Sequence, residues 1–195
     1  MGEAFLRQFL QSKNLLTTCL DATYEQTSSE VVLAVNSMAA TFKLGGRVLV
    51  CGNGGSAADA MHFAGELVAT FQRDVVRPAL SAIALSSDIA SITAYANDFS
   101  YNDVFARQVS AHGRPGDCLL AISTSGKSQN ILQAAREARS REISVISVTG
   151  CGGGELAALS DISIVIPSND TQTIQNTYQF LLHVICYGIE SQLRT

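Results

Sequence analysis

From residue 47 onward, short apolar runs alternate with segments of helical spacing, and this alternation constrains the fold more than any other feature of the chain. Each run is rich in aliphatic and β-branched residues; the runs are Arg47–Cys51, Leu80–Leu85, Asp117–Ser123, Ile143–Thr149 and Asp161–Ile166. Apolar strands separated by helices are typical of a parallel sheet that is covered on both faces. We therefore expect an α/β fold, a three-layer αβα sandwich around a doubly wound, five-stranded parallel sheet.

Helices are predicted between these strands and at both ends of the chain. Within the first 45 residues, Thr27-Ser28-Ser29-Glu30 has the spacing of a capping box and Gly45-Gly46 is a helix stop. The stretch from Thr171 to Ile189 predicts a long C-terminal helix with apolar residues on most of its circumference, which we expect to be buried against other subunits. The helical segments between the strands are Ser56–Phe71, Ser87–Tyr95 with Asn102–Ala111, Ser128–Ser140 and Glu155–Leu159.

We interpret residues 1–195 as a single domain, with a helical arm over 1–45 and an α/β core with the C-terminal helix over 46–195. Hydrophobic residues make up 47% of the chain and charged residues 15%, which excludes a disordered protein. The net charge is −4 and no run of Lys or Arg occurs, so we expect no nucleic acid partner. The C-terminal helix carries several amide side chains, which are too polar for a membrane span.

The cysteines and the N-terminus indicate a cytoplasmic protein. The five cysteines are scattered without paired spacing, which favours reduced thiols over a disulfide frame or a zinc cluster. The first residues lack the basic and then apolar order of a secretion signal.

A glycine-rich loop follows the first predicted strand, in the segment Cys51-Gly52-Asn53-Gly54-Gly55-Ser56. Glycines let a ligand approach the backbone, and the N–H groups at the start of the following helix attract an anion. The alternative is a tight turn with Ser56 as the N-cap of that helix. No Gly-Lys-Ser/Thr follows, which excludes a P-loop.

A second loop, Ser123-Thr124-Ser125-Gly126-Lys127-Ser128, joins the third strand to a helix. One Ser or Thr is enough to cap a helix, whereas this loop has four hydroxyls. Several donors at a helix N-terminus are what a phosphate monoester needs. A nicotinamide cofactor would use only the first loop and would leave the second unexplained, so we expect no nucleotide cofactor.

Two of the three histidines are candidates for chemistry. His62 lies four residues before Glu66 and therefore on the same helix face, and His183 lies eight residues after Gln175, on roughly the same side of the C-terminal helix. Without a functional role, His62 and Glu66 would be a surface pair and His183 a histidine of the core. The functional ones are general acid–base catalysis beside a phosphate and ligation of a divalent metal by all four side chains. Ala96-Asn97-Asp98 is either a further polar site or a helix-ending turn.

Together these segments resemble the phosphoheptose isomerases of the sugar isomerase (SIS) domain superfamily, over nearly the whole chain and with matching order. The motifs are those at 51–56, Met61–Leu67, 96–98, Ile122–Ser128, and Ile174-Gln175 with His183. The resemblance implies a flavodoxin-like SIS fold, a homotetramer with active sites at subunit interfaces, and isomerisation of sedoheptulose 7-phosphate to D-glycero-D-manno-heptose 7-phosphate through an enediol. That product is an early intermediate of heptose biosynthesis for the lipopolysaccharide core.

The resemblance also implies roles for single residues. Glu66 would be the base and His183 its acid–base partner, and we expect these two groups to come from different chains. One zinc ion per subunit would be held by His62, Glu66, Gln175 and His183, a role that conflicts with full basicity of Glu66. The phosphate would be held by Ser56, Ser123, Thr124, Ser125 and Ser128, and the sugar would be lined by Asn53, Gly54, Gly55, Asn97, Asp98 and Gln175.

The chain departs from the family pattern at three positions. Asn176 and Tyr178 stand where the family commonly has Glu and His, and Thr70 stands where many members have Arg. These departures leave the Glu66 and His183 pair intact and bear on substrate range. The alternative function is a non-catalytic phosphosugar-binding protein like the DnaA initiator-associating protein, which shares the fold but lacks the matching acidic residue and histidine.

Overall fold

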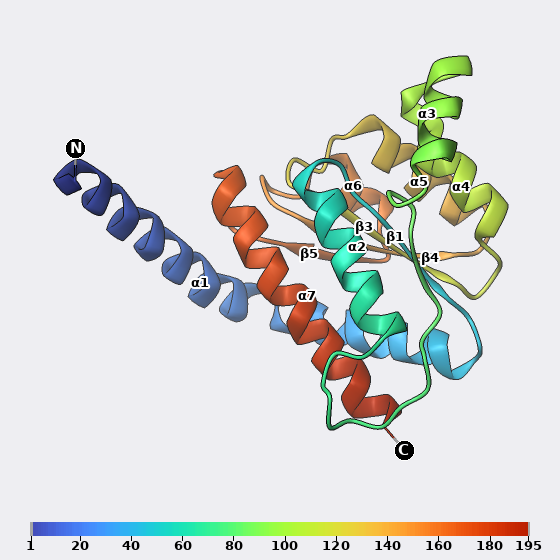
Figure 1. Cartoon of the computed structure of the whole chain (residues 1–195), viewed down its shortest axis with the longest axis horizontal. Helices are drawn as coiled ribbons and strands as arrows, with labels where there is room; N and C mark the ends of the chain where they lie inside the picture. The colour runs from blue at the N-terminus through green and yellow to red at the C-terminus, as the bar shows by residue number, and fades with distance from the viewer. Residues whose placement is uncertain (1, 195) are drawn as a thin grey trace.

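The computed structural model describes residues 2–194 and contains a five-stranded, fully parallel sheet with helices on both faces (Figure 1). The strand order is β2-β1-β3-β4-β5, the flavodoxin-like order of a doubly wound sheet. This confirms the predicted fold class. The strands are β1 Val48–Cys51, β2 Ala82–Ala84, β3 Cys118–Ser123, β4 Ser144–Thr149 and β5 Ile162–Val165.

The helices lie where helical spacing predicted them, with shifted ends. The helix after β1 ends at Val68 rather than Phe71, and the helix after β2 continues past Tyr95 to Asp98. The helices are α1 Gly2–Lys43, α2 Gly55–Val68, α3 Ile89–Asp98, the 3-10 turn η1 Tyr101–Asp103, α4 Val104–His112, α5 Gln129–Ser140, α6 Gly154–Leu159 and α7 Thr171–Leu193.

Successive strand residues point to opposite layers, which divides the apolar core into two. Val48 and Leu120 belong to the layer that packs against α1, α2 and α7. Leu49 and Leu119, their neighbours along the strands, belong to the layer that packs against α4, α5 and α6. Because both faces are covered, every residue of β1 and β3 is buried, as expected for central strands of a parallel sheet.

α1 is one continuous helix, so the capping-box interpretation of Thr27-Ser28-Ser29-Glu30 was wrong. The hydroxyl of Thr27 donates to the carbonyl of Thr23 one turn earlier, as a mid-helix threonine does, instead of capping a new helix. The predicted stop is confirmed: Gly45 has a φ of 79°, and the N–H of Gly46 donates to the carbonyl of Thr41.

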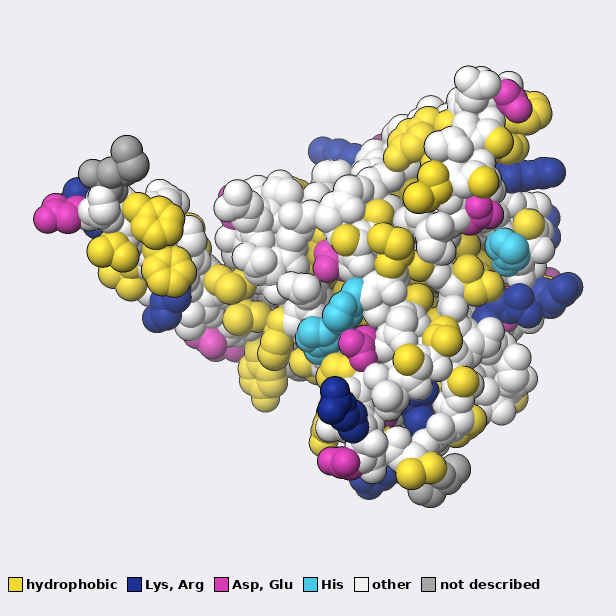
Figure 2. Space-filling view, viewed as in Figure 1, with side chains coloured by type: hydrophobic (Ala, Val, Ile, Leu, Met, Phe, Trp, Pro, Cys, Tyr) yellow, Lys and Arg dark blue, Asp and Glu magenta, His cyan; other side chains and the backbone are white. Residues whose placement is uncertain are grey.

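The first part of α1 extends away from the sheet as an arm (Figure 1). Phe5, Leu6, Phe9 and Leu10 on this arm are each more than half exposed, and Figure 2 shows apolar side chains gathered there. On α7, Phe180 is also exposed to solvent, so one chain alone covers only part of this helix. Among the described residues, no helix has the length and apolar character that crossing a bilayer requires.

Two helical glycines give a test of the packing between α1 and α7. A Cβ on Gly188 of α7 would lie 2.8 Å from Val35 Cγ1, whereas a Cβ on Gly65 of α2 would meet nothing within 4 Å. Overpacking costs about 1–3 kcal/mol, and replacing an open helical glycine by alanine gains up to about 1 kcal/mol. We expect Gly188→Ala to lower the free energy of unfolding and Gly65→Ala to raise it, measured by urea denaturation. Equal effects of the two substitutions would contradict this close helix contact.

Candidate active site

Two loops that carry predicted ligand residues meet at the carboxyl ends of the neighbouring strands β1 and β3. Strand order reverses between these strands, and this is where doubly wound sheets bind their ligands. Asn53 of the first loop and Asn130 of α5 exchange two amide hydrogen bonds of 2.8 and 2.9 Å. The hydroxyl of Tyr101 donates to Asn53 as well, at 3.1 Å. The first loop is therefore fixed to the start of α5.

The first loop opens directly into α2 without a side-chain cap. Gly54 is the N-cap residue with a φ of 56°, and no side chain caps this end. Ser56, the alternative N-cap, lies inside the helix, and its Oγ is 2.7 Å from the hydroxyl of Tyr178. The capping interpretation of Ser56 was therefore wrong, and the first N–H groups of α2 are left without a side-chain acceptor.

The second loop has hydroxyls that do not cap the following helix either. Ser128 is the N-cap residue of α5, but its side chain makes no capping bond and lies 3.3 Å from the Oγ of Ser123 instead. The Oγ of Ser125 accepts from the N–H of Lys127 at 3.2 Å, so the loop turns sharply. A cluster of hydroxyls at a helix N-terminus suits a phosphate monoester.

The loop after β4 and helix α6 hold the second loop through backbone hydrogen bonds. The N–H of Gly150 donates to the carbonyl of Thr124, and the N–H of Leu156 donates to the carbonyl of Gly126. Gly126 has a φ of 62°, and a Cβ there would lie 2.0 Å from the carbonyl oxygen of Gly153. Because backbone meets backbone here, only glycine fits, and the loop has little freedom to move.

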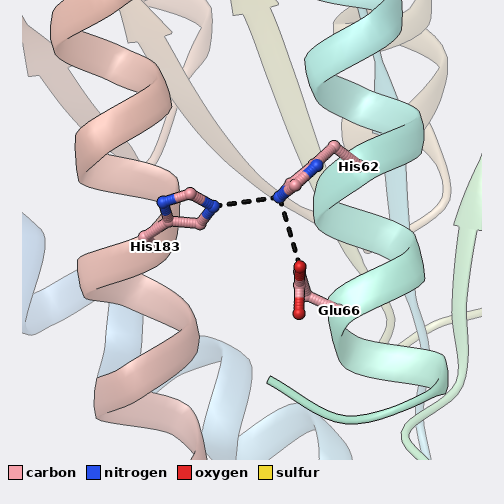
Figure 3. A group of neighbouring side chains, drawn as sticks. All are labelled: His62, Glu66 and His183. Carbon is pink, nitrogen blue, oxygen red and sulfur yellow. Dashed lines mark hydrogen bonds and ion pairs between the residues drawn. The ribbon is translucent and has the colours of Figure 1, made fainter. Parts of the chain in front are cut away.

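His62, Glu66 and His183 form a cluster between α2 and α7, about two turns along α2 from the first loop (Figure 3). His62 Nε2 is 2.9 Å from His183 Nε2 and 3.2 Å from Glu66 Oε1. One ligand atom from each side chain lies within 4.8 Å of the others. His62 is the most exposed of the three, and Figure 2 shows histidine and acidic side chains open to solvent on this face. This geometry suits either proton transfer or metal binding.

The cluster forms within one chain, because α2 and α7 of the same molecule carry its members. Our expectation that Glu66 and His183 come from different chains was therefore wrong. Residues distant in sequence meet because α2 and α7 pack side by side on the same face of the sheet (Figure 1).

A buried ion pair fixes the end of α2 to α7. Arg77 Nε is 2.7 Å from Glu190 Oε1, and neither side chain is more than 1% exposed. The same guanidinium donates to the carbonyls of Glu66 and Leu67, the last turn of α2. Glu190 also accepts the backbone N–H of Phe71. Arg77 thus satisfies the carbonyls that the helix end leaves free.

Phe71 connects this ion pair with the histidine cluster. The ring centroids of Phe71 and His183 are 5.6 Å apart, and the backbone N–H of Phe71 is held by Glu190. Arg77 bonds to the backbone carbonyl of Glu66, and Glu190 holds Phe71, whose ring lies against that of His183. The positions of Glu66 and His183 therefore depend on the same buried pair.

Gln175 lies near the start of α2. A Cβ on Gly55 would lie 2.4 Å from Gln175 Nε2, which places this amide against the first loop. Its ligation of a metal remains a prediction. Burial raises the pKa of the Tyr178 hydroxyl, and hydrogen bonds with Ser56 and Gln175 oppose that rise. Tyr178 therefore stays protonated and neutral at pH 7.

Asn97 and Asp98, two further predicted site residues, lie at the end of α3. They form the exposed last turn of α3, where Asn97 donates to Asp98 at 2.8 Å. The helix-ending interpretation is correct for this segment, and its contact with a sugar remains a prediction.

Sequence reasoning missed several residues of the site. Asn130, Tyr101 and Phe71 have no local motif, and only the fold brings them to the loops and to His183. Arg77 and Glu190 had a weaker signal, because Glu190 is a single charge that follows a long uncharged stretch.

Comparison with known proteins shows the family. A model described as the SIS domain matches residues 13–150. The chain belongs to the SIS domain family. Among its curated relatives, the phosphoheptose isomerase of Aromatoleum aromaticum is 44% identical and covers 96% of this chain and 93% of the relative. That of Helicobacter pylori is 42% identical, with 94% and 93% coverage.

Solved structures of this family have the same fold over nearly the whole chain. A phosphoheptose isomerase from Francisella tularensis superposes with a TM-score of 0.90 at 36% identity, covering 98% of this chain and 99% of the other. The phosphoheptose isomerase from Neisseria gonorrhoeae gives 0.87 at 36% identity, with 97% and 98% coverage. The predicted resemblance is confirmed.

We expect Glu190→Gln to destabilise the protein strongly. Gln keeps the shape but leaves the guanidinium of Arg77 buried without its counter-charge, and breaking a buried pair costs about 3–5 kcal/mol. Glu155→Gln is the matched control, because its pair with Arg136 is exposed and exposed pairs contribute less than about 1 kcal/mol. Urea unfolding measures both. Equal midpoints for the two variants would contradict the role of the buried pair.

Proposed function

We propose that this protein is a phosphoheptose isomerase, an aldose–ketose isomerase that converts sedoheptulose 7-phosphate to D-glycero-D-manno-heptose 7-phosphate. The observation that carries the proposal is that α2, which holds His62 and Glu66 of the cluster, begins at the first of two loops suited to an anion. Relatives named phosphoheptose isomerase match nearly the full chain and support it. The reaction belongs to the early steps of heptose biosynthesis.

The two loops hold the phosphate end of the substrate and leave the other end for chemistry. Hydroxyls and N–H groups at the starts of α2 and α5 donate to the phosphate oxygens. The phosphate residues are Ser56, Ser123, Thr124, Ser125 and Ser128, and the sugar is lined by Asn53, Gly54, Gly55, Asn97, Asp98 and Gln175. Binding at the phosphate fixes the reacting carbons against the cluster, which lowers the entropic part of the barrier.

Glu66 and His183 carry out the proton transfers. Glu66 takes a proton from C1 of the ketose while the C2 carbonyl oxygen gains a proton, which gives the enediol. The C1 hydroxyl then loses its proton as Glu66 returns one to C2, which gives the aldose. His183 gives and takes the protons on the two oxygens. C1 is oxidised and C2 reduced by the same amount, so the reaction needs no nucleotide cofactor.

The cluster also suits a zinc ion, one per subunit. Two imidazoles and a carboxylate with ligand atoms within 4.8 Å are a donor set that zinc commonly takes, with Gln175 as the proposed fourth ligand. A bound divalent metal polarises the sugar oxygens and so favours loss of the adjacent proton. His62, Glu66 and His183 would hold this metal together with Gln175.

Glu66→Gln and His183→Ala are expected to fold and to bind sugar phosphate, yet to lose isomerisation by at least a factor of about 10²–10⁴. Glu66→Gln removes the base and His183→Ala the acid–base partner, while the loops that hold the phosphate are unchanged. Product formation from sedoheptulose 7-phosphate, followed by NMR, measures the loss. The matched control is Glu137→Gln on α5, which should keep full activity. Activity close to wild type in Glu66→Gln would contradict the assignment.

Zinc is expected to remain with the purified protein and to be lost in His62→Ala. Removing one imidazole from the proposed four-residue donor set weakens binding sharply, whereas His112→Ala, at the exposed end of α4, changes nothing. Elemental analysis after dialysis measures the metal content, and turnover before and after chelation shows whether the metal is needed. Equal metal content in the two variants would show that the cluster is not a metal site.

A homotetramer explains the apolar surface that one chain leaves open. The arm of α1 and the outer face of α7 expose Phe5, Phe9, Phe180 and Val184, which a neighbouring copy can bury. Sedimentation is expected to give about four times the mass of one chain, and Phe5→Ser with Phe9→Ser to give smaller species. A wild-type monomer would refute the tetramer.

All five cysteines are free, which suits a reducing cytoplasm.

A further inference from the structure

Tyr178 is a polar side chain in an otherwise apolar layer. It is fully buried among residues of α1, α2, α7 and the sheet, in the core that includes Phe63 and Ile174. A phenylalanine would fill the same space, so packing alone does not account for the hydroxyl. That hydroxyl lies 2.7 Å from Ser56 Oγ, at the start of α2.

Counting protons gives this hydrogen bond a direction. A serine hydroxyl has one proton, and the oxygens of a phosphate dianion accept and cannot donate. When Ser56 donates its proton to a phosphate, it has none left for Tyr178. Tyr178 must then donate to Ser56 Oγ. The tyrosine oxygen remains free to accept from the amide of Gln175, with which it is also hydrogen-bonded.

We propose that Tyr178 is a positioning residue that orients the Ser56 hydroxyl as a donor toward the phosphate group of the substrate. Donation runs in one direction, from the Gln175 amide to Tyr178, from Tyr178 to Ser56, and from Ser56 to the phosphate. The inference rests on the proposed function for the place of the phosphate, and it assigns the buried tyrosine a part in binding but none in proton transfer.

The hydrogen bond between Tyr178 and Ser56 also links the proposed phosphate site to the packing of two helices. Tyr178 belongs to α7 and Ser56 to α2, so the hydrogen bond crosses between the two helices that carry the histidine cluster. Ser56 is only 5% exposed, and its hydroxyl is already hydrogen-bonded to Tyr178. A donor held in place before the ligand arrives does not have to be ordered on binding.

The test is a double-mutant cycle with Tyr178→Phe, Ser56→Ala and the double variant. The probe is inorganic phosphate, its dissociation constant measured by calorimetry, and KM and kcat for sedoheptulose 7-phosphate are measured in parallel. Tyr187→Phe is the matched control, because it removes the same hydroxyl from an exposed side chain of the same helix.

Tyr178→Phe is expected to weaken phosphate binding roughly 3- to 10-fold and to raise KM by a similar factor, with kcat within about twofold of wild type. Ser56→Ala is expected to weaken binding about tenfold or more, and the double variant to bind no worse than Ser56→Ala, because Tyr178 acts through Ser56. Tyr187→Phe should bind like wild type.

Unchanged phosphate affinity in Tyr178→Phe, or losses that simply add in the double variant, would overturn the inference. A lowered kcat with unchanged phosphate affinity would also overturn it, because the tyrosine would then act at the reacting carbons. Phosphate binding does not require turnover. If the wild type binds phosphate but does not convert the sugar, the proposed function fails while the cycle still decides the role of Tyr178.

Discussion

The buried pair of Arg77 and Glu190 is the interaction on which the site most depends. It joins the end of α2 to α7 by a 2.7 Å ion pair that solvent does not reach. A buried pair contributes little net stability compared with an apolar pair of the same size, but it tolerates few alternative arrangements. Here the carbonyl of Glu66 and the backbone of Phe71 bond to it directly. We therefore infer that this ion pair fixes the arrangement of the site residues more than it stabilises the fold.

The sheet and the helices supply different parts of the site. Strands β1 and β3 end in loops that carry hydroxyl and N–H donors at the switch point, which is where a parallel sheet offers an anion site. The imidazoles and the carboxylate stand on α2 and α7, on one face of that sheet. A phosphorylated sugar can therefore be held at one end by the loops while its other end meets the cluster. Asn53 and Asn130 fix the first loop to the start of α5, next to the second loop.

The sequence predicted the fold and most of the site because both follow from local patterns. Apolar strands and helical spacing identified the layers, and the loop hydroxyls stood next to predicted strand ends. The capping box at Thr27 failed because a local motif does not show whether the helix before it continues. Asn130, Tyr101 and Phe71 were missed because their partners lie far away in sequence. Likewise, the meeting of His62 and His183 in one chain required the packing of α2 on α7.

The most direct test of the account follows the hydrogen that moves between C1 and C2. Isomerisation in D2O is read by NMR at C2 of the aldose product. Proton transfer through an enediol with Glu66 as base predicts that solvent deuterium appears at C2, since the carboxylic acid exchanges its proton with water. Complete transfer of a C1 label to C2, with no deuterium from solvent, would show that the migrating hydrogen never exchanges with water and would contradict the account.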